Sequence, residues 1–131
     1  MKMMFDYTVM TANDFDSAVA RVEEEVAKAG MRVLHVHDVA ATLAEKGFTR
    51  EPFKIIEFCS ASYADAFLNA DIKIGLCMPC KINVYAKDGQ TVISGMRPTT
   101  LRQLFPDAAV GDMPEEIDRK IETIINNAQH I

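Results

Sequence analysis

The stretch Ile74-Gly75-Leu76-Cys77-Met78-Pro79-Cys80-Lys81-Ile82-Asn83-Val84-Tyr85 decides the fold prediction, because it holds two of the three cysteines and runs into the clearest strand of the chain. From residue 80 onward, apolar side chains at 80, 82 and 84 alternate with Lys81, Asn83 and Tyr85. This period of two predicts a strand with one buried face and one face in water or at an interface. Asp88-Gly89 is a hairpin signal, so residues 91–96 are expected to return antiparallel.

Three earlier strands are predicted, at residues 3–10, 31–39 and 53–59, because each segment is rich in strand-forming residues. A helix capped by Asn13 is expected between the first two, ending at Gly30. Asp38 is expected to cap a short helix over residues 39–46. A third helix follows residue 59, with Ser60 or Ser62 as its cap and Asp65 at capping-box spacing from residue 62.

The end of the chain predicts a short helix from residue 99 or 100 to 105 and a long final helix. Asp112 is expected to cap the long helix, with Glu115 at capping-box distance. Its apolar side consists of Ile117, Ile121, Ile124, Ile125 and Ala128. This order of elements predicts an α+β fold, a two-layer sandwich of a mainly antiparallel sheet with helices on one face.

Composition limits the domain count and the partners. A length of 131 residues suits one domain covering 1–131. The net charge is −5 and the 14 Lys and Arg residues are scattered, so nucleic acid is not an expected partner. No apolar run approaches the roughly 18 residues of a membrane span, and residues 1–6 resemble a strand more than a signal peptide. We therefore predict a cytoplasmic protein without a membrane partner, whose three cysteines are thiols.

Cys77-Met78-Pro79-Cys80 has the spacing of a dithiol redox motif. Redox cysteines of this kind sit at a helix N-terminus that stabilises the thiolate, whereas both cysteines here are expected to enter a strand. A zinc site would need a second pair of ligands, and none follows at finger spacing. The alternative is that Cys77 and Cys80 are small buried hydrophobic residues.

Cys59 and two histidines are the other residues with candidate chemistry. Cys59 lies between a predicted strand and a predicted helix, a position where a thiol pKa tends to be lowered, although a packed core cysteine is the alternative. If the strands at 53–59 and 80–85 are neighbours, Cys59 and Cys80 could face each other. His35 and His37 point to one face of their strand, but two ligands do not make a metal site. We predict no metal site and no cofactor.

Catalytic signatures are absent from the sequence: it has no nucleophile elbow, no glycine-rich phosphate loop and no zinc-protease helix motif. The sequence therefore does not predict an enzyme.

Four segments of the chain, residues 38–47, 53–59, 66–71 and 74–85, together resemble the bacterial and archaeal family called domain of unknown function 302. That family has an aspartate after the second strand, a Leu-x-x-Lys-Gly segment, a cysteine closing the third strand and a Gly-Leu-x-x-Pro-Cys stretch entering the fourth. The matching positions here are Asp38, Leu43, Lys46, Gly47, Cys59, Gly75, Leu76, Pro79 and Cys80.

Two positions depart from the family pattern. Ser60-Ala61 stands where members commonly have Asn-Pro, and Cys77 stands where they usually have an aliphatic residue. The second departure weakens the prediction of a Cys77–Cys80 dithiol. The pair that the resemblance highlights is Cys59 with Cys80.

The resemblance implies a compact two-layer α/β domain, similar in layout to TATA-box-binding-protein-like folds and usually paired as a homodimer, with no settled activity. The leading hypothesis is a homodimeric ligand-binding or accessory protein that takes a small molecule near Asp38, Cys59, Pro79 and Cys80. One alternative is a thiol-based redox or sulfur-handling protein, with Cys59 as nucleophile and Cys80 as its resolving partner. Another is an interaction module whose Lys81-Asn83-Tyr85 face or edge strand forms the dimer contact.

Overall fold

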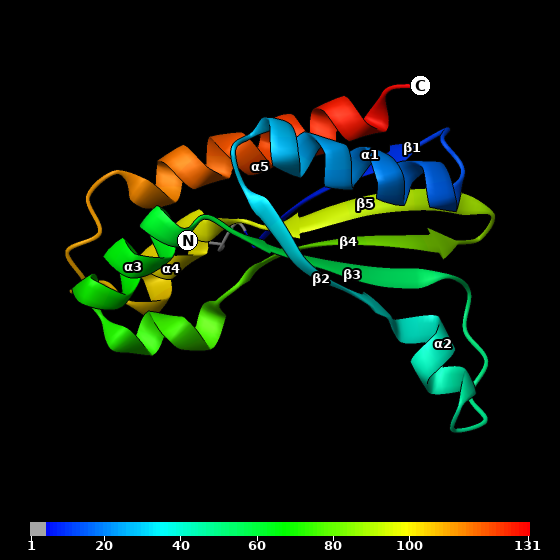
Figure 1. Ribbon diagram of the computed structural model, residues 1–131, viewed down its shortest axis with the longest axis horizontal. Helices are drawn as coiled ribbons and strands as arrows, with labels where there is room; N and C mark the ends of the chain where they lie inside the picture. Colours follow the sequence, from blue (N-terminus) through cyan, green and yellow to red (C-terminus); the bar gives the residue numbers. More distant parts are fainter. Residues whose placement is uncertain (1–4) are drawn as a thin grey trace.

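The computed structural model describes residues 5–131, in which five strands form one sheet (Figure 1). The strands run in the order β1-β5-β4-β3-β2, and every neighbouring pair is antiparallel. The expected antiparallel sheet is therefore confirmed. The strand bounds are β1 (Asp6–Thr11), β2 (Arg32–Asp38), β3 (Phe53–Cys59), β4 (Cys80–Lys87) and β5 (Gln90–Met96).

The helices form the second layer of the sandwich and extend it at both ends. Helices α1 (Phe15–Lys28) and α5 (Met113–Gln129) lie over one face of the sheet (Figure 1). Short helices gather where β3 ends and β4 begins, while α2 (Val39–Ala44) projects from the opposite end. The predicted two-layer α+β sandwich is thus confirmed. The short helices are α3 (Ala61–Ala70), α4 (Leu101–Leu104) and the 3-10 helices η1 (Ile72–Cys77) and η2 (Pro98–Thr100).

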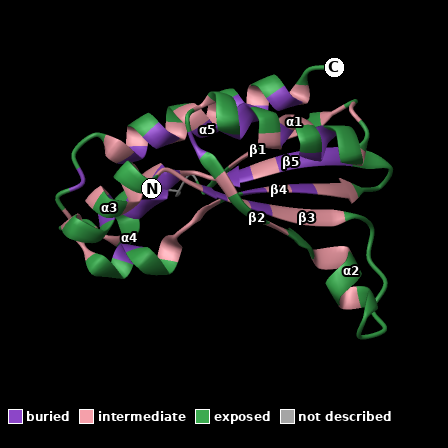
Figure 2. Cartoon of the chain, in the orientation of Figure 1, coloured by how far each residue is buried: buried purple, intermediate pink, exposed green. Residues whose placement is uncertain are grey.

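The core lies between the sheet and the two long helices (Figure 2). Ile82 and Val84 of β4 are fully buried, whereas Lys81 is exposed, as the alternation predicts. The predicted apolar side of α5 is confirmed, because its four isoleucines and Ala128 are all buried. Helix α1 contributes a stripe of small residues from the other side of the core: Ala18, Val19, Val22 and Val26.

Helix α5 lies so close to β5 that position 95 leaves little room for a side chain. A Cβ atom on Gly95 would lie 3.1 Å from Cδ1 of Ile125 and 3.2 Å from Cγ2 of Ile121. It would also lie 3.4 Å from Cγ1 of Ile82 on the neighbouring strand. The glycine is therefore needed for the close approach of the helix to the sheet.

Polar contacts fix α5 to the two elements beside it. Arg97, at the end of β5, donates to Asp118 at 2.7 Å and pairs with Glu122 at 2.7 Å. Glu25 of α1 is buried and accepts a hydrogen bond from Asn127 of α5 at 2.8 Å. That bond, with the ammonium of Lys28, lowers the pKa of Glu25. The buried carboxylate is consequently stabilised as an anion between the two helices.

The predicted β4–β5 hairpin is confirmed. Asp88 and Gly89 both have positive φ, at 54° and 78°. Two successive residues with positive φ define the turn that matches the twist of two-residue hairpins.

Several helix starts differ from the prediction. Asp14, not Asn13, caps α1, and its carboxylate accepts from the backbone N–H of Ser17 at 2.8 Å. Asn13 instead donates to the carbonyls of Ala128 and His130 at 3.1 and 3.0 Å, so its amide is occupied by the end of α5.

Two predicted capping boxes are also wrong. Asp112 precedes α5 but makes no side-chain cap bond, and Glu115, its expected partner in the box, accepts from Arg102. Ser62, the expected cap of the other box, lies inside α3, and its expected partner Asp65 accepts from Asn69. Ser60, the alternative cap, precedes α3 but makes no side-chain cap bond. The first strand begins at residue 6, and the predicted positions 3 and 4 lie outside the described residues.

Replacing Gly95 by alanine should lower the free energy of unfolding by about 1–3 kcal/mol, because the added methyl group overpacks the interface between β5 and α5. Urea unfolding followed by circular dichroism measures this change.

Ile125→Val is the matched second variant, since it deletes the Cδ1 atom that the new methyl group would meet first. Alone it should cost about 0.5–1.5 kcal/mol. In combination with Gly95→Ala, it should give a loss smaller than the sum of the two single losses. A strictly additive pair would contradict the proposed contact.

Candidate functional site

The ends of two paired strands bring Cys59 and Cys80 to the same place. In the β3–β4 ladder, Phe58 lies directly opposite Cys80, the first residue of β4. Cys59 is the next residue along and the last of β3. The chain turns directly from Cys59 into α3, whose backbone begins with a bond from Ala64 N–H to the Ser60 carbonyl. The sheet order that the sequence left open therefore puts both thiols at one end of the sheet.

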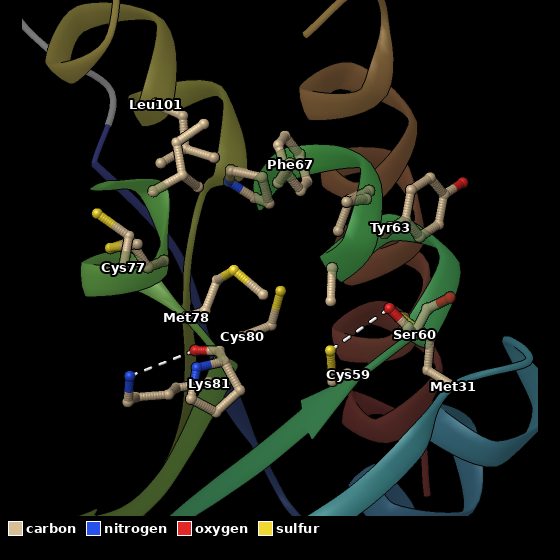
Figure 3. A pocket seen from close by; sticks show the side chains of 16 residues that line it. Met31, Cys59, Ser60, Tyr63, Phe67, Cys77, Met78, Cys80, Lys81 and Leu101 are labelled. Carbon is tan, nitrogen blue, oxygen red and sulfur yellow. Dashed lines mark hydrogen bonds between the residues drawn. The ribbon is translucent and has the colours of Figure 1, made fainter. Parts of the chain in front are cut away.

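A small, mostly apolar pocket opens at this end, between β3, β4 and the short helices (Figure 3). Its cavity volume is about 50 Å³. A single water needs roughly 10–15 Å³ by this measure, so the pocket has room for a ligand the size of a few waters. The side chains that line it include Met31, Cys59, Tyr63, Phe67, Met78, Pro79, Cys80, Met96, Leu101 and Ile117.

Sulfur-containing side chains line much of this pocket, Cys77 among them. Figure 3 shows the side chains of Cys59, Met78 and Cys80 directed into the cavity, whereas Cys77 lies apart from the other two cysteines. Cys77 is the last residue of η1, so the expectation that both cysteines of the Cys77–Cys80 motif enter a strand is wrong for the first of them. All three cysteines are partly buried free thiols.

The thiols of the pocket are held in their neutral form. Burial raises the pKa of Cys59 above its ordinary value of 9.0. Burial, with a further contribution from Cys59, raises the pKa of Cys80 to about 11. The expectation that the strand-to-helix position lowers the pKa of Cys59 is therefore wrong. Burial destabilises the thiolate more than the start of α3 stabilises it.

Two hydrogen bonds lie beside the cysteines of the pocket. The Cys59 thiol donates to the Ser60 carbonyl, with a sulfur to oxygen distance of 3.4 Å. The ammonium of Lys81 donates to the Pro79 carbonyl at 3.3 Å. Lys81 lowers the pKa of Cys80 only as the smallest of three contributions. The pocket therefore resembles an apolar binding site more than the electropositive surroundings of a reactive cysteine.

Asp38 is not brought to this pocket. It pairs with Lys54 at the opposite end of β3, so it lies about 17 Å along the strand from Cys59, at roughly 3.4 Å per residue. Its carboxylate accepts from the Ala41 backbone N–H at 2.9 Å and caps α2, as the sequence predicts. Of the four candidate ligand-binding residues, the pocket thus unites Cys59, Pro79 and Cys80.

His35 and His37 form a separate cluster on β2. Their rings meet edge to face with centroids 4.3 Å apart, and the His37 ring contacts the Glu57 carboxylate. Within residues 5–131, no group of three or more His, Cys, Asp or Glu side chains is arranged to hold a metal ion.

Sequence reasoning missed most of the pocket wall. Met31 precedes β2, Met96 ends β5 and Leu101 begins α4, so these residues come from three separate parts of the chain. In the sequence, only their apolar character could have pointed to them, and ordinary core residues share that character. These residues meet at the pocket because of the order of the strands in the sheet, which no single segment of the sequence encodes.

The same part of the chain, residues 5–131, contains no helix that is both long enough and apolar enough to cross a membrane.

Comparison with known proteins finds a family model and a solved structure that are similar to this chain. A family model described as domain of unknown function DUF302 matches residues 7–128. A crystal structure of a protein described as uncharacterized conserved protein DUF302, from Bacillus stearothermophilus, is 30% identical in sequence, with a TM-score of 0.89. That match covers 96% of this chain and 99% of the other. No curated protein matches the sequence. Neither description states an activity, so a functional proposal has to come from the pocket.

The pH dependence of alkylation tests the state of the thiols. On the folded protein, Cys80 should react with iodoacetamide with an apparent pKa of about 11, and Cys59 with one above 9.0. Mass spectrometry of peptides separates these sites from Cys77. A Cys59 or Cys80 that reacts with an apparent pKa below the usual value of about 8.5 would show that the pocket stabilises a thiolate.

The same pKa shift gives a check that needs no reagent. The unfolded chain loses the Cys80 proton near pH 9.0 and the folded chain near 11, so the folded protein should lose stability as the pH rises between these values. The loss should be smaller in Cys80→Ala than in the wild type.

Proposed function

This chain belongs to the family of domain of unknown function DUF302, and we propose that it is a ligand-binding or accessory protein whose ligand occupies the pocket at the meeting of β3, β4 and α3. One observation carries the proposal: side chains from both layers of the fold surround a cavity that stays open and is lined mainly by apolar and sulfur atoms. Protein interiors are otherwise closely packed, so such a cavity beside the surface suits a ligand.

The pocket favours a small ligand whose contacting atoms are polarisable. Its cavity volume of about 50 Å³ is far below the roughly 300–1,000 Å³ of sites for drug-sized molecules. Neutral thiols, thioethers and rings of Phe67 and Tyr63 offer dispersion contacts and few hydrogen bonds. A ligand of a few polarisable atoms is therefore the best match.

The competing proposal is a redox or sulfur-handling protein that uses Cys59 and Cys80. The nearness of the two residues supports it, because each lies at the end of a strand in the same ladder. The raised pKa of each thiol counts against it, since the thiolate is the reactive form. Binding therefore remains the leading proposal.

We also propose that two copies pair through the face of the sheet that α1 and α5 leave uncovered. The Lys81-Asn83-Tyr85 side of β4 lies there, opposite Glu57, Ile55 and Phe53 of β3. Phe53 and Tyr85 stack with their ring centroids 5.3 Å apart. Stacked aromatic rings on a half-buried sheet face supply the kind of surface that a second copy can cover.

Methyl-labelled methionine offers a direct test of the pocket. Dimethyl sulfide should shift the ¹³C-methyl signals of Met31, Met78 and Met96 but not that of exposed Met10. Its affinity should be no tighter than about 1 mM, because so few atoms contribute. Dimethyl sulfoxide, of similar size but polar, should leave the three signals unchanged.

Two alanines of α3 provide matched variants for this test. Ala64 lines the pocket, so Ala64→Leu should fill it and abolish the response to dimethyl sulfide. Ala61 lies exposed on the same helix, so Ala61→Leu should leave the response intact. An equal response in both variants, or an equal shift at Met10, would contradict binding in this pocket.

Light scattering after size exclusion tests the pairing. At micromolar concentration the wild type should give twice the chain mass of 14.6 kDa. Ile55→Glu should give the monomer, because it adds a charge to the uncovered face. Ser62→Glu, at an exposed position of α3, is the control that should remain dimeric. A wild-type monomer would refute the pairing.

A further inference from the structure

We propose that the ligand of this pocket is a single soft, thiophilic cation of the Cu(I) class, bound by the sulfur atoms of Cys59, Met78 and Cys80. This inference rests on the proposed function, because it names the chemical class of ligand for the same pocket.

The arrangement of sulfur atoms supports the assignment. Cys59 closes β3, Cys80 opens β4, and Met78 lies two residues before Cys80. All three side chains point into one cavity, and the β3–β4 ladder holds the two cysteines at neighbouring positions (Figure 3). The ends of two paired strands thus position the two cysteines, which is a rigid support for a metal site, and Met78 joins them from the short connection between η1 and β4.

The size of the pocket also agrees with an ion. The cavity of about 50 Å³ is much smaller than the sites that hold drug-sized molecules. A single cation with sulfur ligands needs little space beyond the contacts to those ligands. Water and oxygen ligands are largely excluded by the apolar lining, which includes Phe67, Leu101 and Ile117.

The ligand set selects a soft cation over the common hard ones. Thiolates and thioethers favour Cu(I), whereas Mg²⁺ and Ca²⁺ require oxygen ligands. Structural zinc takes four ligands from Cys, His and carboxylates, and within residues 5–131 no group of even three such side chains is placed for a metal. Two cysteine sulfurs and one methionine sulfur therefore suit a cation that binds only two or three ligands.

Binding is a proton exchange without electron transfer. Each of the two thiols gives up its proton as its sulfur binds the cation, so one monovalent cation replaces two protons and the site gains one negative charge. The ammonium of Lys81, beside Cys80, lies where it can offset part of that charge. The cation enters as Cu(I) and leaves as Cu(I), and no sulfur is oxidised.

Cys77 is not part of the proposed site, although it shares a motif with Cys80. It also lines the pocket, but it ends η1 and lies apart from Cys59 and Cys80 (Figure 3). The sequence motif pairs Cys80 with Cys77, whereas the structure places Cys80 beside Cys59. Cys77 is therefore a useful control.

The test is an anaerobic titration of the full chain with Cu(I) supplied as its bathocuproine disulfonate complex. The wild type should remove one Cu(I) per chain from the chelator. Because changes to residues that only support a metal ligand already cost about 10–100-fold in affinity, Cys59→Ser and Cys80→Ser should each cost at least about 100-fold. Met78→Leu should cost about 10-fold. Cys77→Ser should bind as the wild type does.

A second measurement avoids any loss of folding in the variants. Cu(I) added to the wild type should protect Cys59 and Cys80 together from alkylation in alkaline buffer, and leave Cys77 reactive. Protection of Cys77 with Cys80, or no retention of Cu(I) by the wild type, would overturn the proposal. If dimethyl sulfide still shifts the three pocket methionines while Cu(I) is not retained, the cation assignment fails and the binding function stands.

Discussion

The close contact between α5 and β5 at Gly95 is the constraint on which the rest of the structure depends. Because position 95 carries no side chain, Ile121 and Ile125 pack directly against the sheet. This contact fixes the height and register of α5, and the ion pairs of Arg97 hold the helix there. Residues on either side of the contact then line the pocket: Met96 at the end of β5, Leu101 beyond it, and Ile117 in the first half of α5.

The pocket combines burial with neutral sulfur. A thiol tolerates an apolar environment better than a carboxylate or an ammonium does, because its neutral form is the stable one at ordinary pH. Cys59 and Cys80 can therefore line a cavity without a charged partner, and burial raises the pKa of both. The same environment that disfavours the thiolate leaves the sulfur atoms available to polarisable ligands, which is why we propose binding in preference to catalysis.

Local patterns in the sequence were sufficient to predict most of the helices and strands. The alternation at residues 80–85, the Asp88-Gly89 turn and the isoleucines of α5 each depend on near neighbours, and each prediction was confirmed. The helix caps failed where a side chain had a distant alternative: Asn13 binds the end of α5, and Glu115 binds Arg102. The meeting of Cys59 with Cys80 depends on the order of the strands, and Met31 and Met96 reach the pocket only through tertiary packing. Asp38 matched the family pattern, but capping α2 accounts for it.

The central claim is that an open, apolar, sulfur-lined cavity lies at the meeting of β3, β4 and α3. A crystal structure determined under xenon pressure tests it most directly, because xenon is polarisable, fits small apolar cavities and needs no hydrogen bond. We expect one xenon atom within about 4.5 Å of side-chain atoms of Cys59, Met78 and Cys80. A pocket closed by the side chains of Phe67 and Leu101, with no xenon bound there, would contradict the claim.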